Sequence, residues 1–216
     1  MRNKFGWGLM TILSLLIVLV TGRYLRLNPD DFFPEQKAVY MAHQLGIWSH
    51  VLGGVLALGL GPFQFLVGVR TKYPVVHRWL GRGYLMGVLL GGVAGLYMAT
   101  YAYTGAVAGL GFATLALIWL ITGFMAYVRI RQGDVQAHRR WIIRNFALTF
   151  GAVVLRLQLG ILGMFLDFET AYMIGAWSAW IPNLIIVEWF LNRPQPVVRR
   201  RAALATLGKN PVEHTS

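Results

Sequence analysis

Residues 110–128 decide the fold class, and they read LGFATLALIWLITGFMAYV. This stretch contains no charged residue, and its length is close to the roughly 20 residues that cross the hydrocarbon core of a bilayer as a helix. Lipid offers no hydrogen-bonding partner, so a segment of this kind must satisfy its backbone internally as a helix. Arg129 follows at once and marks the end of the apolar run.

Other apolar stretches of similar length lie on both sides of this one. They are Trp7–Gly22, Gln44–Val69, Trp79–Tyr103, Trp141–Phe165 and Ala171–Leu191. The chain of 216 residues is 56% hydrophobic and 13% charged, more apolar surface than a water-soluble domain of this length can hide. The sequence predicts an all-α, polytopic membrane helical bundle of about six transmembrane helices. Residues 1–193 are expected to form a single transmembrane domain, and residues 194–216 a basic, flexible cytoplasmic tail.

Lysine and arginine fall in segments that alternate onto one side of the expected bundle. They are Arg2, Lys4, Arg70, Lys72, Arg78, Arg82, Arg129, Arg131, Arg139, Arg140, Arg144, Arg193, Arg199, Arg200, Arg201 and Lys209. Because basic loops stay in the cytoplasm, both termini are expected there, with the protein a multi-pass component of the cell inner (plasma) membrane. The net charge of +12 then reflects topology and attraction to anionic lipid headgroups. Nucleic acid is not an expected partner.

Polar residues interrupt the second and fifth stretches at a similar depth from the outer side. Arg156 lies about 13 Å from the outer end of its helix, at about 1.5 Å per residue. His50 follows His43 by seven residues, a spacing that places both on one helix face. With Gln158 added, we expect an outer polar cluster of four residues. It is either a hydrogen-bond network that locks helices together or a ligand or ion site that opens outward.

The inner side carries a partly duplicated motif. One copy is His77-Arg78-Trp79 followed by Arg82, and the other is His138-Arg139-Arg140-Trp141 followed by Arg144. Both copies lie at helix N-termini on one face, where arginine side chains, free N–H groups and the helix dipole favour an anion. Ordinary anchoring at the headgroups also explains the arginines and tryptophans. It does not explain the histidine that begins each copy.

Small residues recur every fourth position on the third stretch, from Gly83 to Gly95, and on the second, from Gly53 to Gly61. Such stripes let helix backbones approach closely, and a smooth glycine face also suits a flat cofactor. Pro62 is expected to kink the second helix near its cytoplasmic end.

Cysteine is absent, which excludes disulfides, thiolate metal sites, iron–sulfur clusters and covalently attached haem. The sequence also lacks a glycine-rich phosphate loop, a Gly-x-Ser-x-Gly elbow and a His-Glu-x-x-His motif. We therefore assign no catalytic residue.

The polar motifs together resemble a bacterial family of predicted membrane proteins, domain of unknown function family 2306, over roughly His43 to Arg156. The residues that carry the resemblance are His50, Gly61-Pro62-Phe63-Gln64-Phe65, Arg70, Pro74, His77-Arg78-x-x-Gly81-Arg82-x-Tyr84, His138-Arg139-Arg140-Trp141-x-x-Arg144 and Arg156. This resemblance implies a membrane protein and assigns no activity.

The layout is also similar to the six-helix, two-haem transmembrane cytochromes b. That resemblance implies a haem b near the cytoplasmic face, with His77 and His138 as axial ligands of the iron. The arginines of the two motifs would surround its propionates: Arg78, Arg82, Arg139, Arg140 and Arg144. The fourth stretch has no histidine, so the outer haem of that family lacks a ligand here.

Three functional hypotheses follow from these features. The first is transmembrane electron transfer through a haem b held by His77 and His138. The second is binding or carriage of a small anionic or lipid-like ligand, either at the outer cluster or at the inner arginines. The third is a structural or assembly role, in which the polar clusters only hold helices together.

The charge pattern makes a prediction about topology. Reporter fusions at Gly133 and after Arg201 should report the cytoplasm, and a fusion at Pro34 should report the outside, because basic loops resist translocation. A cytoplasmic signal from the Pro34 fusion would contradict the whole arrangement.

Overall fold

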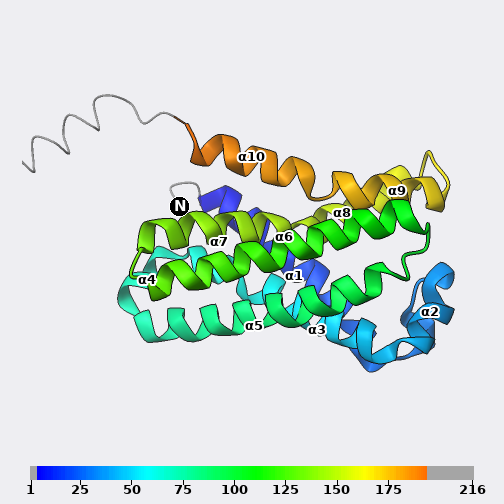
Figure 1. Cartoon of the computed structure of the whole chain (residues 1–216), viewed down its shortest axis with the longest axis horizontal. Coiled ribbons are helices and arrows are strands. Elements are labelled where there is room, and N and C mark those ends of the chain that lie inside the picture. The colour runs from blue at the N-terminus through cyan, green and yellow to red at the C-terminus, as the bar shows by residue number, and fades with distance from the viewer. Residues whose placement is uncertain (1–3, 194–216) are drawn as a thin grey trace, which may run out of the picture.

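The computed structural model describes residues 4–193, and these form helices, turns and short loops without a strand. Among residues 4–193, six segments are long and apolar enough to span a membrane, which confirms the predicted helical bundle (Figure 1). They consist of α1 (Lys4–Gly22) with η1 (Arg23–Arg26), α3 (Gln44–Leu60) with η4 (Pro62–Phe65), α5 (Pro74–Ala99), α6 (Ala106–Arg131), α7 (Val135–Thr149) with α8 (Gly151–Leu162), and α9 (Phe168–Ser178) with α10 (Ile181–Leu191). The predicted basic tail, 194–216, lies outside the described residues.

Short helices connect the first three spans. At the expected outer end, η2 (Pro29–Asp31), η3 (Pro34–Gln36) and α2 (Lys37–Ala42) join the first span to α3. At the other end, α4 (Val67–Lys72) joins η4 to α5. Pro62 ends the regular part of the second span, since α3 stops at Leu60 and the chain continues as a 3-10 turn, as its ring and missing N–H predict.

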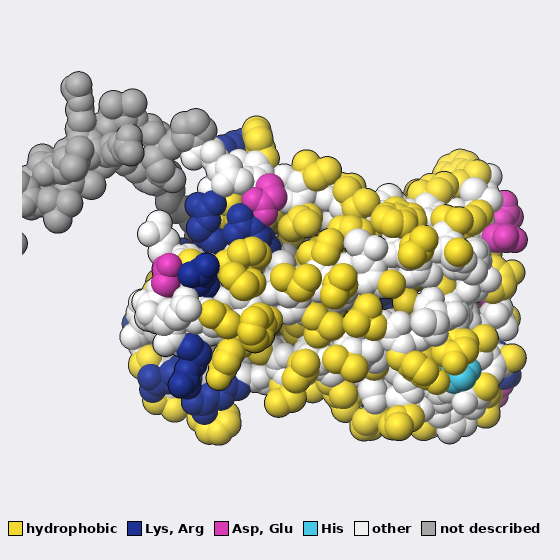
Figure 2. All heavy atoms as spheres, viewed as in Figure 1, with side chains coloured by type: hydrophobic (Ala, Val, Ile, Leu, Met, Phe, Trp, Pro, Cys, Tyr) yellow, Lys and Arg dark blue, Asp and Glu magenta, His cyan; other side chains and the backbone are white. Residues whose placement is uncertain are grey.

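Charged side chains gather at the two ends of the bundle, and apolar side chains cover the face between them (Figure 2). Lysine and arginine are concentrated at the end that holds α4 and the first turns of α7. A band of exposed apolar side chains flanked by charge is the surface that a lipid bilayer requires. The direction in which the bundle crosses the membrane stays a prediction.

The glycine stripes bring α3 and α5 into direct backbone contact. A Cβ atom added at Gly53 would lie 2.2 Å from the Gly91 nitrogen, and one added at Gly87 would lie 2.8 Å from the Gly53 carbonyl oxygen. At Gly83 an added Cβ would meet the Leu60 side chain at 2.9 Å. The stripe therefore serves helix packing, and because α3 covers it, no flat cofactor can lie along this part of it.

A buried hydrogen-bond network ties α5, α6 and α7 together. The Tyr84 hydroxyl donates to Asn145 Oδ1 at 2.6 Å, and Asn145 Nδ2 donates to the Trp119 carbonyl oxygen at 2.7 Å. Trp119 Nε1 donates to Thr149 Oγ1 at 2.8 Å. Each of these polar groups has a partner, so the network adds rigidity without the cost of an unpaired buried group.

The fifth and sixth spans are interrupted near the middle of the bundle. The helix breaks at Phe150 between α7 and α8, and at Trp180 between α9 and α10. The breaks are adjacent, since a Cβ added at Gly151 would lie 3.2 Å from the Trp180 Cβ. Asn183 Nδ2 donates to the Ala179 carbonyl oxygen at 3.0 Å, which satisfies backbone that the interruption exposes.

The contact between α3 and α5 generates a stability prediction. Gly53→Ala should lower the free energy of unfolding in detergent by about 1–3 kcal/mol, the usual cost of overpacking a tight contact. Gly59→Ala is the matched control on the same helix, because an added Cβ there meets only a Val18 methyl group at 3.9 Å. Equal stability of the two variants would contradict the packing described here.

Candidate ligand-binding site

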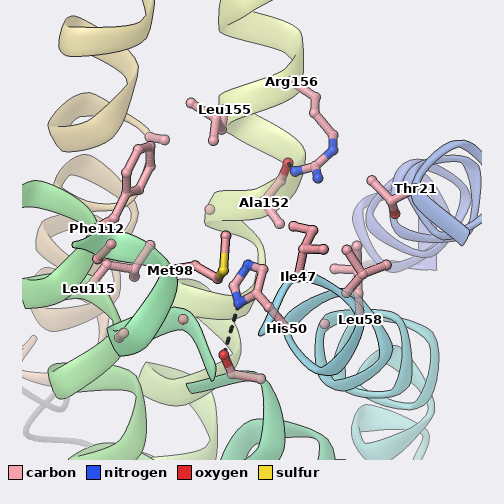
Figure 3. A pocket seen from close by; sticks show the side chains of 18 of the residues that line it. Thr21, Ile47, His50, Leu58, Met98, Phe112, Leu115, Ala152, Leu155 and Arg156 are labelled. Atoms are coloured by element: carbon pink, nitrogen blue, oxygen red, sulfur yellow. Dashed lines mark hydrogen bonds between the residues drawn. The ribbon is translucent and has the colours of Figure 1, made fainter. Parts of the chain in front are cut away.

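A cavity of about 240 Å³ lies between the middle of the bundle and the short helices at its expected outer end. Residues from all six spans and from the η3–α2 segment line it, and most of them are apolar or aromatic. The side chains able to form hydrogen bonds are Thr21, Tyr24, Gln36, Tyr40, His50, Trp119, Thr149, Arg156, Tyr172 and Trp180. Figure 3 shows that α3, α5, α6 and α8 supply facing side chains around one space.

Arg156, on α8, is a cation that lines this cavity. Its Nη1 donates to the carbonyl oxygen of Ala152 at 3.0 Å, one turn earlier in the same helix. Within residues 4–193 no aspartate or glutamate lines the cavity, and the ion pairs involve other cations. The guanidinium has five N–H donors, so it can still bind an anion.

His50, on α3, faces the same cavity (Figure 3). The residue is exposed, and it lines the cavity. Its Nδ1 bonds the carbonyl oxygen of Gly91 on α5 at 2.9 Å. Gly95 makes room for the ring, because a Cβ added at residue 95 would lie 3.0 Å from Nδ1.

The short helices close the outer end of the cavity with tyrosine and glutamine. Gln36 Nε2 donates to the Tyr101 carbonyl oxygen at 3.2 Å, while its Oε1 is buried without a hydrogen-bond partner among the described residues. Burial raises the pKa of the Tyr40 hydroxyl, which therefore stays neutral and can both donate and accept. Tyr24 packs edge-on against Phe32 with ring centroids 5.3 Å apart.

The four residues of the predicted outer cluster do not all meet. His50 and Arg156 share the cavity, but His43 lies outside it, stacked on Tyr101 with centroids 3.9 Å apart. The chain leaves helical geometry at His43, so the seven-residue spacing to His50 does not put the two on one face. Gln158 accepts a hydrogen bond from the Ser178 hydroxyl at 3.2 Å and does not line the cavity.

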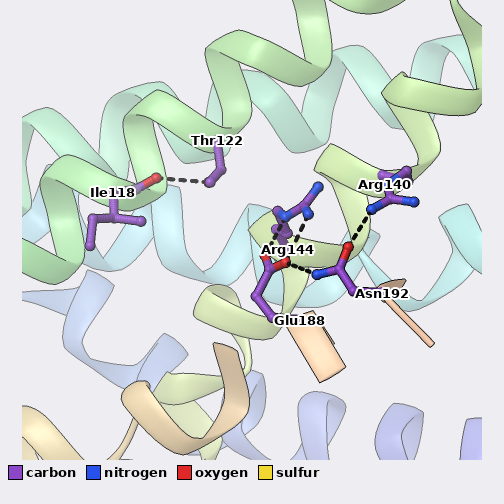
Figure 4. A network of polar contacts seen from close by, with 6 residues as sticks. All are labelled: Ile118, Thr122, Arg140, Arg144, Glu188 and Asn192. Atoms are coloured by element: carbon purple, nitrogen blue, oxygen red, sulfur yellow. Dashed lines mark hydrogen bonds and ion pairs between the residues drawn. The ribbon is translucent and has the colours of Figure 1, made fainter. Parts of the chain in front are cut away.

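Two arginines of the duplicated inner motif, Arg140 and Arg144, belong to one network of hydrogen bonds and an ion pair (Figure 4). Arg144 Nε and Nη2 donate to the two oxygens of Glu188, the second at 2.9 Å. Asn192 Nδ2 donates to Glu188 Oε2 at 3.0 Å, and Arg140 Nη2 donates to Asn192 Oδ1 at 2.9 Å. The arginines Arg78, Arg82 and Arg139 are exposed. The network fastens α10 to α7 and leaves Arg144 already paired.

The two motif histidines lie at the same end of the bundle, His77 in the first turn of α5 and His138 in the first turn of α7. His138 Nδ1 bonds the Ala126 carbonyl oxygen at 2.8 Å. His77 Nδ1 is buried without a partner among the described residues. Neither histidine lines the cavity that holds Arg156.

Sequence reasoning missed two groups of residues. Asn145 is a buried polar residue near the inner end of an apolar stretch, and the rule that singled out Arg156 applies to it as well. Tyr24, Tyr40 and Tyr172 line the cavity from η1, α2 and α9, and tyrosines near a membrane interface are too common to indicate a site.

A sequence model of one family, described as predicted membrane protein (DUF2306), matches residues 47–191. The chain belongs to the DUF2306 family. This match spans α3 to α10 and therefore includes both His50 and Arg156. In this DUF2306 protein, α1 and the short outer helices that complete the cavity precede the matched region. Searches of curated proteins and of solved structures each returned no match.

Proposed function

We propose that the protein binds an anionic, lipid-like molecule in the cavity, with Arg156 holding the charged head group. One observation carries this proposal. The partly buried Arg156 lines an otherwise largely apolar cavity, and no carboxylate of the described chain neutralises it.

A positive charge within a membrane span carries a cost in free energy. Placing an arginine at the centre of a membrane helix costs at least about 2.5–3.5 kcal/mol, and residues of this kind commonly mark a ligand or ion pathway. A carboxylate or phosphate would pair with the guanidinium through two parallel hydrogen bonds. The apolar walls formed by residues such as Leu58, Met98 and Leu155 would take up an acyl chain by the hydrophobic effect.

The position of the cavity suggests the side from which a ligand enters. Trp119 and Thr149, which line the cavity, also belong to the buried network that binds α6 to α7. Trp180 occupies the break in the sixth span and packs in the same core cluster. This rigid layer separates the cavity from the basic end, so we propose that ligand arrives from the outer leaflet or the outer solution.

Arg156→Gln tests the proposal. Binding of octanoate to protein in lipid nanodiscs, measured by titration calorimetry against empty nanodiscs, should weaken at least tenfold, or about 1.4 kcal/mol. Arg26→Gln is the matched control, because Arg26 pairs with Asp31 at 3.0 Å away from the cavity. Arg156→Lys should bind with intermediate affinity, since it keeps the charge and loses the planar fork. Unchanged binding in Arg156→Gln would contradict the proposal.

The same variant distinguishes binding from a purely structural role. If Arg156 exists to hold a ligand, removing its unpaired charge should leave the thermal stability of the empty protein unchanged or raise it. If Arg156 only locks helices together, Arg156→Gln should unfold at a lower temperature. The fraction that stays folded should then bind octanoate with wild-type affinity.

Electron transfer through a haem b is the second candidate function, and it belongs to the inner end. Two observations favour it: His77 and His138 lie in helix first turns at the same end of the bundle, and His138 Nδ1 bonds a backbone carbonyl oxygen. That bond leaves Nε2 free, an arrangement common in metal-binding histidines. A bis-histidine haem would supply one-electron transfer. The glycine stripe gives it no wall, because α3 occupies that face.

A visible absorption spectrum decides the haem hypothesis. Protein purified from cells supplied with haem precursor should show a Soret band that is lost in both His77→Ala and His138→Ala. His43→Ala, which alters a histidine at the opposite end of the bundle, should keep it. A featureless spectrum from folded wild-type protein would rule the haem out.

A further inference from the structure

We infer that the head group of the ligand carries a hydrogen-bond donor beside its acid, so that the preferred ligand class is a single-chain hydroxy acid. The inference rests on the proposed function and deepens it. Arg156 binds the anionic group of the ligand, and His50 accepts a hydrogen bond from its donor.

The partner of His50 determines which ring nitrogen carries the proton. Its Nδ1 lies 2.9 Å from the Gly91 carbonyl oxygen, and a carbonyl oxygen can only accept. Nδ1 must therefore hold the hydrogen, and in the neutral ring Nε2 is then an acceptor. The carbonyl belongs to the most tightly packed part of α5, where Gly91 touches α3. The ring is held in one orientation.

The surroundings of His50 keep the ring neutral. Arg156 lines the same cavity, and its positive charge disfavours a second positive charge on His50. The other ionisable side chains that line the cavity are Tyr24, Tyr40 and Tyr172, which are neutral when protonated. A second positive charge in this cavity would have no carboxylate to offset it among the described residues. Nε2 therefore remains an acceptor.

That acceptor has no protein partner. Among the described residues the only hydrogen bond of His50 is the one through Nδ1, and Figure 3 shows the rest of the ring turned into the cavity below Arg156. A ligand with an acid alone would pair with Arg156 and leave Nε2 unpaired. A ligand that also carries a hydroxyl group would satisfy both, and a site built in this way discriminates strongly against the analogue without the hydroxyl.

The size of the cavity limits the enclosed part of the ligand. A volume of about 240 Å³ corresponds to the space of about eight water molecules at roughly 30 Å³ each in the liquid. A hydroxy acid head and the first carbons of its chain fill such a space. We therefore choose 3-hydroxyoctanoate as the probe, with octanoate and 3-methoxyoctanoate as analogues. The methoxy compound keeps the oxygen and lacks the donor.

The experiment compares these three acids by titration calorimetry on full-length protein in nanodiscs. Wild-type protein should bind 3-hydroxyoctanoate at least tenfold more tightly than octanoate, and 3-methoxyoctanoate no more tightly than octanoate. In His50→Phe the preference for the hydroxyl should fall to about one, while octanoate binding changes less than about threefold. His43→Phe is the matched control and should keep the wild-type preference, because His43 lies outside the cavity.

The outcomes separate this inference from the proposed function. If octanoate and 3-hydroxyoctanoate bind wild-type protein equally and both depend on Arg156, the hydroxyl inference is wrong and the proposed function stands. If neither acid binds in an Arg156-dependent way, both are wrong. Should His50→Phe fail to fold, the comparison of hydroxy and methoxy acids on wild-type protein still decides, since equal binding of these two would overturn the inference.

Discussion

The backbones of α3 and α5 touch at Gly53 and Gly91, and the rest of the structure depends on that contact. In a bilayer no hydrophobic effect drives helices together, so close packing of small residues must do so. An added Cβ at Gly53 would lie 2.2 Å from the Gly91 nitrogen, a separation that no other residue type allows. The same approach brings the Gly91 carbonyl to His50, one turn before Gly53. A packing constraint thereby fixes the orientation of a ring in the candidate site.

The cavity forms where close helix-to-helix packing is interrupted. Opposite α3 and α5, the fifth and sixth spans break at Phe150 and Trp180, and Arg156 projects from the helix that restarts after the first break. Below the breaks, the Tyr84–Asn145 hydrogen bond and its neighbours hold three spans rigidly. A rigid lower layer and an unfilled upper one explain why the cavity persists without collapse, and why its walls can be preorganised for a ligand.

Arg144 and Arg156 show how environment separates structural from functional arginines. Both lie on the fifth span, but Arg144 forms a bidentate pair with Glu188 and stacks over Trp141 at 4.9 Å. Its hydrogen bonds join two spans near the headgroup region. Arg156 bonds only a carbonyl of its own helix, among the described residues. Paired charge contributes to holding the bundle together, whereas unpaired buried charge costs stability and is retained where a ligand can neutralise it.

The sequence by itself determined the spans, the close packing along the glycine stripes, the kink at Pro62, and the depth of His50 and Arg156. These properties depend on composition within one helix, because twenty apolar residues must span a bilayer whatever surrounds them. Only the tertiary structure decided that Arg156 shares a cavity with His50 and not with His43 or Gln158, that Glu188 neutralises Arg144, and that tyrosines line the outer part of the cavity. Such pairings depend on how each helix is rotated about its axis and where it breaks. Side-chain packing between distant segments sets the rotation of each helix and the position of its break. The spacing of residues along one segment does not determine either.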